Sequence, residues 1–353
     1  MSKLQLGDIS VNFVRALRDT IRLYQVDSMP LLESYGITEE LLSAPKARIS
    51  IPKFMRLGHA AIEATGEPAL GLVMGGATHV GHTGLPGYAA MTAPDLGQAL
   101  ATLIHFERLG SQNQRGYSQF YHEQGFGVAR FYSLSPYNEY NFFVVDLMLS
   151  CWFHLGRWMT GTDRLVREVQ IEYPRPPYHH RHEELFQCPV LFDQPRNALI
   201  LTRDALRQPC RFSAPATHAE ALAACQTELL ELTRRQNLRE RVERILTSQF
   251  QGKTPTMPDV ASQLGMSPWT LRRKLEKEGV QFQDLLEKSR RSLAESYVRN
   301  TNLSFSEIAF RLGFSSPAAF HRAFRRWTQC SPGHYRGAEH RGEEHEIKAS
   351  HEY

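Results

Sequence analysis

The chain has 353 residues, of which 42% are hydrophobic and 22% are charged, so it is long enough for two domains and has the composition of a globular protein. The longest apolar stretch, Phe142 to Phe153, contains Asp146 and is shorter than the roughly 20 residues that a membrane helix needs, and the charged side chains between Met1 and Tyr24 argue against a secretory signal. The 5 cysteines form no CxxC pair, so we expect a reduced, cytoplasmic protein without a disulfide framework or a zinc ribbon.

The net charge of +4 is concentrated in one part of the chain. Residues 1–235 contain 22 Lys and Arg against 23 Asp and Glu, residues 236–336 contain 17 against 9, and residues 337–353 contain 2 against 5. A basic block of domain size is typical of a protein that binds a polyanion, because each neutralised phosphate releases condensed counterions. A solvated basic face without a partner has the same composition. We expect a first domain at 1–235, a second at 236–336, and a charged, disordered tail at 337–353.

The first 235 residues carry the patterns of an α+β domain. Segments with helical periodicity or helix-start signals alternate with short runs that are typical of strands. The predicted helices cover Ile9 to Leu23, Pro52 to Ala64, Pro94 to Leu109 and Asn141 to Met159, and the predicted strands cover Gln119 to Tyr121, Gly127 to Tyr132, Glu168 to Tyr173 and Ala198 to Leu201.

Aromatic residues are dense in the middle of this domain. A pocket for a small molecule and a packed core both produce this pattern, and the sequence does not separate the two. Arg108, Arg115 and Arg130 are candidates to anchor a carboxylate, although a solvated arginine is the simpler interpretation for each. The sequence therefore leaves the ligand-contacting residues unknown. The aromatic residues concerned are Phe106, Tyr117, Phe120, Tyr121, Phe126, Phe131, Tyr132 and Tyr137.

Motifs for catalysis and metal binding do not emerge from the first domain. The sequence contains no GxSxG, and its glycines at 71–81 do not fit a GxGxxG phosphate loop. His179, His180, His182 and Cys188 match no zinc spacing, and the prolines at 174–177 predict that these residues lie on a loop. We therefore expect no catalytic residues, no cofactor and no metal.

A run without Gly or Pro extends from Glu220 to Leu246 and carries apolar residues at mostly helical spacing. One interpretation is a dimerisation helix followed by the first helix of the next domain, and the other is a helix that packs on its own domain. Both fit the pattern. Arg234, Arg235 and Gln236 interrupt the apolar stripe, so we place the domain boundary near Arg235.

The basic block contains an internal repeat. Val260-Ala261 followed by Leu264-Gly265 recurs 48 residues later as Ile308-Ala309 followed by Leu312-Gly313. Each copy predicts a short helix that ends at its glycine, because glycine adopts the left-handed cap conformation without strain. A Ser-Pro pair follows each glycine and predicts the N-cap and first position of a second helix. Each copy therefore has the parts of a helix-turn-helix.

The second helix of each copy has an apolar face and a basic face. Leu271 and Leu275, and likewise Phe320 and Phe324, stand four residues apart and are expected to face inward. Two ordinary helix pairs in a bundle would not need the matched arginines on the other face, which suit the major groove of DNA. Between the copies, Phe282 to Val298 predicts a helix of roughly 26 Å. Such a helix would hold the two units near successive grooves, which are about 34 Å apart.

The second copy resembles the signature of the AraC/XylS family of transcription regulators. The first half of the chain is similar to the arabinose-binding-like domain of one branch of that family, through Gly84 to Leu100 and Cys188 to Phe192 with Asn197 beyond. At Cys330 the chain departs from the glycine that the family usually has. The signature residues are Ile308-Ala309, Gly313-Phe314, Phe320, Arg322 to Arg326, Ser331-Pro332 and Tyr335-Arg336.

The resemblance implies an α+β N-terminal effector domain and an all-α C-terminal domain with two helix-turn-helix units joined by a linker helix. It also implies which side chains meet DNA. Arginine suits bidentate contact with guanine, and Trp269 offers an apolar surface to a thymine methyl. The implied base contacts are Trp269, Arg272, Arg273, His321 and Arg322, and the implied phosphate contacts are Ser267, Lys274, Ser316, Arg325 and Arg326.

These observations predict a sequence-specific DNA-binding transcription regulator, an activator rather than a repressor, and not an enzyme. The expected partners are promoter DNA, RNA polymerase, a second copy of the chain in a homodimer, and a small-molecule effector that is a carboxylic or fatty acid or an amino acid. No membrane partner is expected. Two alternatives stay open: a constitutive or architectural DNA-binding protein whose first domain only dimerises, and an enzyme with a DNA-tethering module.

Overall fold

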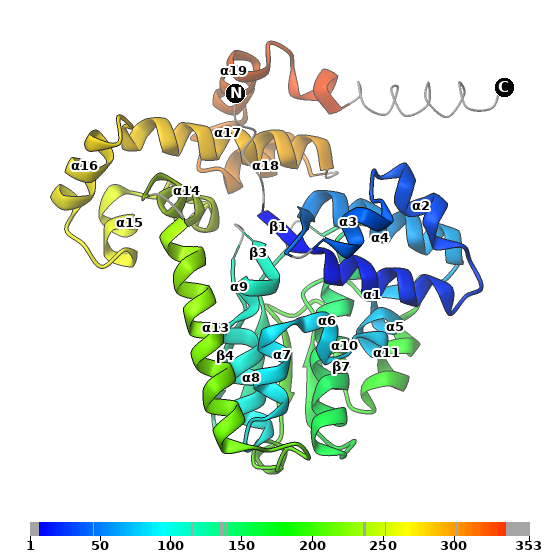
Figure 1. The fold of residues 1–353 in the computed structure, drawn as a ribbon. Coiled ribbons are helices and arrows are strands. Elements are labelled where there is room, and N and C mark those ends of the chain that lie inside the picture. The colour runs from blue at the N-terminus through cyan, green and yellow to red at the C-terminus, as the bar shows by residue number, and fades with distance from the viewer. Residues whose placement is uncertain are drawn as a thin grey trace. The chain divides into compact units, whose positions relative to one another are not determined.

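The computed structural model describes residues 7–44, 46–113, 116–134, 137–138, 140–235, 238–250, 252–300 and 303–336, so the tail predicted at 337–353 lies outside the described residues. The chain divides into two compact units, and the division lies between Arg234 and Arg235. Each unit is described by itself (Figure 1). Within the described residues, no helix is both long enough and apolar enough to span a membrane.

The N-terminal unit contains two sheets. Their strands are β1 Gly7–Ser10, β2 Arg48–Ser50, β3 Ser111–Asn113, β4 Gln119–Glu123, β5 Phe126–Phe131, β6 Val166–Gln170, β7 Val190–Leu191 and β8 Asn197–Leu201. The smaller sheet is antiparallel with the order β2-β1-β3. The larger sheet has the order β4-β5-β8-β6-β7, with β6 and β7 parallel and the other pairs antiparallel. Strand β8 pairs on both sides and is buried throughout its length.

The helices of this unit gather around one buried helix. They are α1 Val11–Arg22, α2 Ser28–Ser34, α3 Glu39–Ser43, α4 Ile51–Thr65, α5 Leu70–Ala77, α6 Val80–Thr83, α7 Leu85–Met91, α8 Leu96–His105, α9 Glu107–Gly110, α10 Phe142–Thr160, α11 His179–Phe186, α12 Arg203–Leu206 and α13 Pro215–Arg235. Helix α10 is buried along most of its length, as its nearly continuous apolar sequence requires, and Trp158 near its end is exposed. Helix α5 approaches it closely through Gly71 and Gly75, where an added Cβ would lie 2.5 Å from the Phe143 carbonyl oxygen and 2.4 Å from Ser150 Cβ.

A buried carboxylate joins α10 to α11. Asp146 is 1% exposed and accepts hydrogen bonds from the Tyr173 hydroxyl, from His182 Nε2 at 2.8 Å and from the Tyr178 hydroxyl at 3.0 Å. Burial and the nearby Asp146 charge raise the pKa of both tyrosines, so both hydroxyls keep their protons and donate. A charge in the core is tolerated only with such donors, and the network therefore fixes residues 173–182 against the core.

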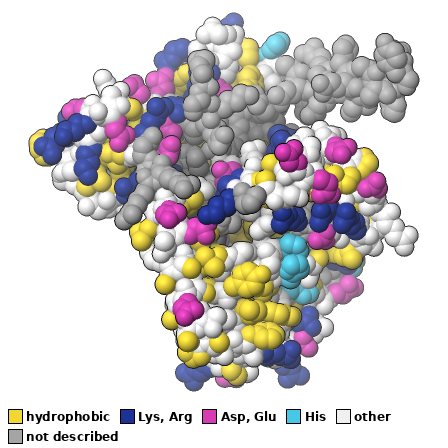
Figure 2. Space-filling view, in the orientation of Figure 1, with side chains coloured by type: hydrophobic (Ala, Val, Ile, Leu, Met, Phe, Trp, Pro, Cys, Tyr) yellow, Lys and Arg dark blue, Asp and Glu magenta, His cyan; other side chains and the backbone are white. Residues whose placement is uncertain are grey.

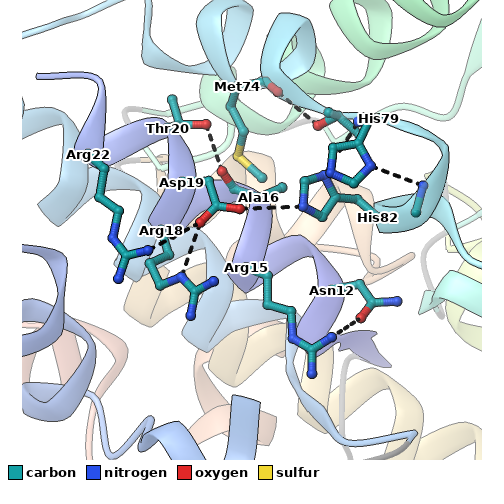
Figure 3. Close-up of polar contacts among 12 residues, drawn as sticks. Asn12, Arg15, Ala16, Arg18, Asp19, Thr20, Arg22, Met74, His79 and His82 are labelled. Atoms are coloured by element: carbon teal, nitrogen blue, oxygen red, sulfur yellow. Dashed lines mark hydrogen bonds and ion pairs between the residues drawn. The ribbon is translucent and has the colours of Figure 1, made fainter. Parts of the chain in front are cut away.

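A histidine pair fixes the corner between α1 and α6 (Figure 3). His79 Nδ1 accepts the N–H of Gly81 at 3.1 Å, and the centres of the His79 and His82 rings are 3.7 Å apart. His82 Nε2 lies 3.7 Å from a carboxylate oxygen of Asp19 on α1. Burial lowers the pKa of His82, so its ring is uncharged at neutral pH and packs against the tilted ring of His79 without charge repulsion.

All regular elements that the structure describes in the C-terminal unit are helices. Its helices are α14 Leu238–Gln249, α15 Met257–Gln263, α16 Pro268–Lys277, α17 Phe282–Asn300, α18 Phe305–Arg311 and α19 Pro317–Thr328. Helix α14 contacts α15, α16 and α17, and α17 also contacts α18 and α19. An ion pair of 2.8 Å between Lys288 Nζ and a Glu243 carboxylate oxygen ties α17 to α14. Helix α17 is thus the element between the two helix-turn-helix units.

The predicted fold class is confirmed, with two local corrections. The helix predicted over Ile9 to Leu23 was given too early a start, because Ile9 belongs to β1 and pairs with Ile49 and Ser111. Ser10 accepts the N–H of Asn12 and starts the helix at Val11. The loop predicted at His179 to Cys188 is also wrong, because His179–Phe186 forms α11 around the bond between His182 and Asp146. The run from Glu220 to Leu246 falls on α13 and α14, and residues 236–237 lie outside the described residues.

We expect Asp146→Ala to lower the free energy of unfolding of the N-terminal unit by about 3–5 kcal/mol, because two buried donors and one half-buried donor lose their acceptor. Urea denaturation followed by circular dichroism measures this loss. Asp163→Ala is the matched control, because its carboxylate is mostly exposed beside Arg157. We expect the control to lose less than about 1 kcal/mol. Equal losses in the two variants would contradict a stabilising role for the buried network.

Candidate nucleic-acid interface

The first helix-turn-helix unit is built from two capped helices. Helix α15 begins at a reciprocal cap, in which Thr256 accepts the N–H of Asp259 and Asp259 accepts the N–H of Thr256. After α15, Gly265 has φ +65°, a conformation that favours glycine, and turns the chain. Ser267 Oγ then accepts the N–H of Thr270 at 3.1 Å, and α16 begins at Pro268. The predicted glycine turn and Ser-Pro helix start are confirmed in this unit.

Helix α16 buries one face and exposes a basic one. Leu271 and Leu275 are buried, whereas Arg272 to Lys274 are exposed. Trp269 is 66% exposed, and the guanidinium of Arg273 lies 4.8 Å from the centre of its ring. This cation–π contact restrains the arginine at the surface. Figure 2 shows Lys and Arg side chains in dark blue over α16, at the left edge of the view.

The second unit repeats the arrangement. Helix α18 begins at a reciprocal cap at Ser304, Gly313 has φ +68°, and Ser316 Oγ accepts the N–H of Ala319 at 3.2 Å at the start of α19. A Cβ on Gly313 would lie 2.7 Å from Thr254 Oγ1, so this glycine also lets the segment before α15 approach. The predicted turn and helix start are confirmed here too, with Pro317 following the cap.

Helix α19 has the same two faces. Phe320 and Phe324 are buried, and Arg322 and Arg325 are exposed. His321 is half-buried, with its ring edge on to the ring of Phe305 at 5.3 Å between centres. Its ring is therefore partly used in packing the second unit.

Arg326 of α19 has a charged partner on α17. It is exposed, and its guanidinium forms an ion pair with Glu287 of α17. Glu287 also accepts the indole N–H of Trp327 at 2.9 Å, and this hydrogen bond together with Arg326 holds the pKa of the carboxyl below its usual value. The pair therefore connects α19 to α17 while leaving the guanidinium at the surface.

The structure places most of the predicted DNA-contacting side chains at the surface. Both serines use their hydroxyl oxygen to accept an N–H of their own helix, and the Ser267 hydroxyl also shares a hydrogen bond of 2.9 Å with the Thr270 hydroxyl. Their contacts with DNA stay predictions. The exposed ones are Trp269, Arg272, Arg273 and Arg322 among the base contacts and Ser267, Lys274, Arg325 and Arg326 among the phosphate contacts, and the half-buried ones are His321 and Ser316.

The sequence patterns did not identify Arg290, which connects the two helix-turn-helix units within the C-terminal unit. This residue of α17 is half-buried, with its guanidinium 5.5 Å from the ring centre of Phe250 and 5.0 Å from that of Phe314. It also donates to Thr254 Oγ1 at 2.6 Å. Burial lowers the pKa of Arg290. An arginine on a predicted surface helix is normally solvated, so the sequence carried no signal for this position.

The N-terminal unit contains two adjoining hollows. An open groove of about 1110 Å³ runs between α8, β4 and α13, and a cavity of about 70 Å³ lies deeper, against α1, α10 and β5. Phe106 and Glu107 line both. Of the other aromatic residues predicted for a pocket, Tyr117, Phe120 and Tyr121 line the groove, Phe131 and Tyr132 line the cavity, Phe126 contacts Arg167 and Tyr137 contacts Glu172.

The three candidate arginines of this unit are not gathered in one place. Arg108 lines the groove, and Arg130 lies on β5 and is half-buried. Arg115 lies outside the described residues. The histidines of α11 do not converge on a common site either, because His182 is buried against Asp146 whereas His180 is exposed.

Both units match models of known families. Residues 26–210 match the arabinose-binding domain of AraC transcription regulator, N-terminal, and residues 260–338 match a helix-turn-helix domain. The first match covers more than half of the chain. The second contains both recognition helices, α16 and α19.

Relatives along the whole chain are regulators. The ornithine utilization regulator of Pseudomonas aeruginosa is 30% identical over 331 residues, which cover 94% of this chain and 96% of the relative. The HTH-type transcriptional regulator VqsM of the same species is 27% identical over 286 residues, which cover 76% of this chain and 84% of the relative. The crystal structure of the transcriptional regulator CdpR from Pseudomonas aeruginosa covers 90% of this chain and 97% of that chain, with 21% identity and a TM-score of 0.41.

The family models and the full-length relative agree on one class of protein. It is a transcription regulator with an N-terminal ligand-binding domain and a helix-turn-helix DNA-binding domain, and not an enzyme. The chain belongs to the AraC family of transcription regulators.

Proposed function

We propose that the chain binds promoter DNA through the exposed faces of α16 and α19 and activates transcription when a small molecule occupies its N-terminal unit. The observation that carries this proposal is the repeated pair of helices, each with a buried apolar face and an exposed face that bears arginines. An amphipathic helix whose polar face bears arginines presents hydrogen-bond donors that fit guanine edges in the major groove.

The bases are contacted by the middle of each recognition helix. Arg272 and Arg273 of α16 reach guanine O6 and N7, and Trp269 contacts a thymine methyl. Arg322 and His321 have the equivalent role on α19. The support is the exposure of Trp269, Arg272, Arg273 and Arg322 and, for Arg273, the ring of Trp269 that holds the guanidinium in place. His321 is half-buried.

The phosphates are contacted at the helix starts and along the flanks. The serine hydroxyls donate to phosphate oxygens at the N-termini of α16 and α19, where the helix dipole favours an anion. The cationic side chains neutralise neighbouring phosphates and make the affinity depend on salt. The residues in this role are Ser267, Lys274, Ser316, Arg325 and Arg326.

The spacing of the two helices is set by α17. This helix has 19 residues and is therefore about 28 Å long, against about 34 Å for one turn of DNA. Two recognition helices held somewhat closer than one turn can both enter major grooves if the duplex bends toward the protein. We therefore propose two successive major grooves on one face of a bent site.

The proposed assembly is a homodimer of two-domain chains. Residues 1–235 form the effector and dimerisation domain, and residues 236–336 form the DNA-binding domain. The chain acts as a homodimer in the cytoplasm and contacts RNA polymerase at the promoter. Helix α13 packs on its own unit through the buried Cys225. The side chain of Leu230 on the same helix is 48% exposed, and this exposed apolar side chain supports dimerisation through α13. Sedimentation equilibrium of the purified chain tests the homodimer, and a monomer at micromolar concentration would contradict it.

The effector is proposed to carry an amino group. Among a carboxylic acid, a fatty acid and an amino acid, the amino acid brings a positive charge, and the carboxylate of Glu107 lines both hollows of the N-terminal unit. The relative named an ornithine utilization regulator supports the same choice. A carboxylic or fatty acid without an amino group would bring its negative charge to this carboxylate.

We expect Arg273→Ala to weaken binding to a promoter fragment that the chain protects from nuclease digestion by about 1–3 kcal/mol, and to weaken binding to random DNA much less, because a base contact is lost. Electrophoretic mobility shifts at one fixed ionic strength measure both affinities. Lys277→Ala is the matched control, because Lys277 is an exposed cation in the last turn of the same helix. An equal loss on promoter and random DNA would make Arg273 a phosphate contact.

We expect Glu287→Gln to raise the affinity for promoter and random DNA alike, by up to about fivefold, because it releases Arg326 from an exposed ion pair for a phosphate. The slope of log affinity against log salt should steepen by up to about 0.9. Fluorescence anisotropy at several salt concentrations measures both quantities. Glu295→Gln, which removes the partner of Arg291 on the same helix, is the control. An unchanged affinity and slope would leave Arg326 without a role at the phosphates.

A further inference from the structure

Glu107 stands where the groove and the cavity of the N-terminal unit meet. It lines both hollows, and one of its carboxylate oxygens accepts the N–H of Ser118 at 2.7 Å. Within the described residues, no Lys, Arg or His forms an ion pair with this carboxylate. Burial outweighs the hydrogen bonds from Ser118 and the charge of the neighbouring Arg108, and it raises the pKa of Glu107 to about 6. At neutral pH the hollow therefore contains a carboxylate that is mostly ionised.

A second polar group, the Ser118 hydroxyl, lies beside the Glu107 carboxylate. Ser118 is buried and lines the groove, and apart from its contact with the Glu107 carboxylate its Oγ has no hydrogen-bond partner among the residues that the structure describes. Buried hydroxyls are normally hydrogen-bonded. The bond between Ser118 N–H and Glu107 places this hydroxyl next to the carboxylate, so two oxygen acceptors lie together at the mouth of the cavity.

The cavity behind these oxygens is apolar. Its wall comes from helices α1, α4, α8 and α10 and from strand β5, and it adjoins the corner that His79 and His82 fix, because Thr83 at the end of α6 also lines it. A volume of about 70 Å³ admits a short chain rather than a long one. The large apolar side chains of the wall are Phe13, Phe54, Phe131, Leu147, Trp152 and Leu155.

We infer that Glu107, Ser118 and this cavity form a binding site for an organic ammonium ion with a short apolar chain. A primary ammonium has three N–H donors and a positive charge, and it can donate to the free carboxylate oxygen of Glu107 and to Ser118 Oγ. The apolar chain of the ligand enters the cavity and is thereby removed from water. This inference rests on the proposed function of the N-terminal unit as the effector-binding part, and it names the chemical class of the ligand and its anchor.

Isothermal titration of the full chain with n-butylamine, 1-butanol and butanoate tests the charge requirement. We expect n-butylamine to bind at least tenfold more tightly than 1-butanol, and butanoate not to bind. In the series from ethylamine to n-hexylamine, the affinity should rise by about fourfold per methylene until the cavity is full. This series uses the unaltered protein, so it decides the inference even if a variant fails to fold.

Glu107→Gln is the sharpest variant, because its amide oxygen still accepts the N–H of Ser118 while the negative charge is lost. We expect this change to weaken n-butylamine binding at least tenfold and to leave 1-butanol binding within twofold of that of the unaltered chain. Glu63→Gln, an acid-to-amide change on the exposed face of α4, is the matched control and should bind n-butylamine normally.

Three results would overturn the inference: equal binding of n-butylamine by Glu107→Gln and the unaltered chain, tighter binding of butanoate than of n-butylamine, or no binding of any of the amines at millimolar concentration. Retention of promoter binding in the same preparations would separate this failure from a failure of the proposed DNA contacts. Tight binding of butanoate would keep an effector site in the N-terminal unit and reject the ammonium class.

Discussion

The surface proposed to face DNA depends on the burial of one apolar face on each of two short helices. Helices α16 and α19 have 10 and 12 residues, and isolated helices of this length are marginal in water. Phe320 and Phe324 are fully buried, and burial of such a side chain contributes roughly 1.5–3 kcal/mol. The same burial fixes the rotation of each helix about its axis. The arginines therefore point outward because the aromatic and leucine side chains point inward.

The two recognition helices are kept in register by polar contacts that do not belong to either of them. Arg290 of α17 lies between the rings of Phe250 and Phe314 and donates to Thr254, which itself donates to the Gly313 carbonyl oxygen. These contacts connect the segment before the first helix-turn-helix unit to the turn of the second helix-turn-helix unit. The guanidinium is partly removed from water, and its Nε has no hydrogen-bond partner within the described residues. The ring contacts and the hydrogen bond to Thr254 therefore replace part of its hydration.

Features that depend on residues close together in the sequence were predicted correctly, whereas features that depend on residues far apart in the sequence were missed. The cap at Ser267 and the turn at Gly313 depend on residues within about four positions, and both were predicted. Strand β1 was missed because Ile9 takes a strand conformation only by pairing with Ile49 and Ser111, far along the chain. Helix α11 was missed because the local prolines predict a loop, and the bond from His182 to Asp146 is not visible in local sequence.

The candidate ligand site was beyond prediction for a related reason. The aromatic density between Phe106 and Tyr137 indicated either a pocket or a core, and the structure shows that these residues are divided among the groove, the cavity and other contacts. Glu107 is one acid among many in the sequence. Its distinction arises from burial and from the lack of an ion-pair partner within the described residues, and both are properties of the folded chain.

Helix α13 offers the physical link between ligand and DNA in the proposed function. Phe106 lines both hollows and packs against Cys225 of α13, and α13 also contributes Leu222 and Gln226 to the groove. The same helix ends at Arg235, where the C-terminal unit begins. A ligand shifts the DNA affinity only as far as it prefers one arrangement of this helix over another. Because linkage is reciprocal, bound DNA must then change the affinity of the N-terminal site for its ligand by the same factor. The tightness of ligand binding alone therefore says nothing about regulation, and the difference in ligand affinity with and without DNA is the quantity that defines it.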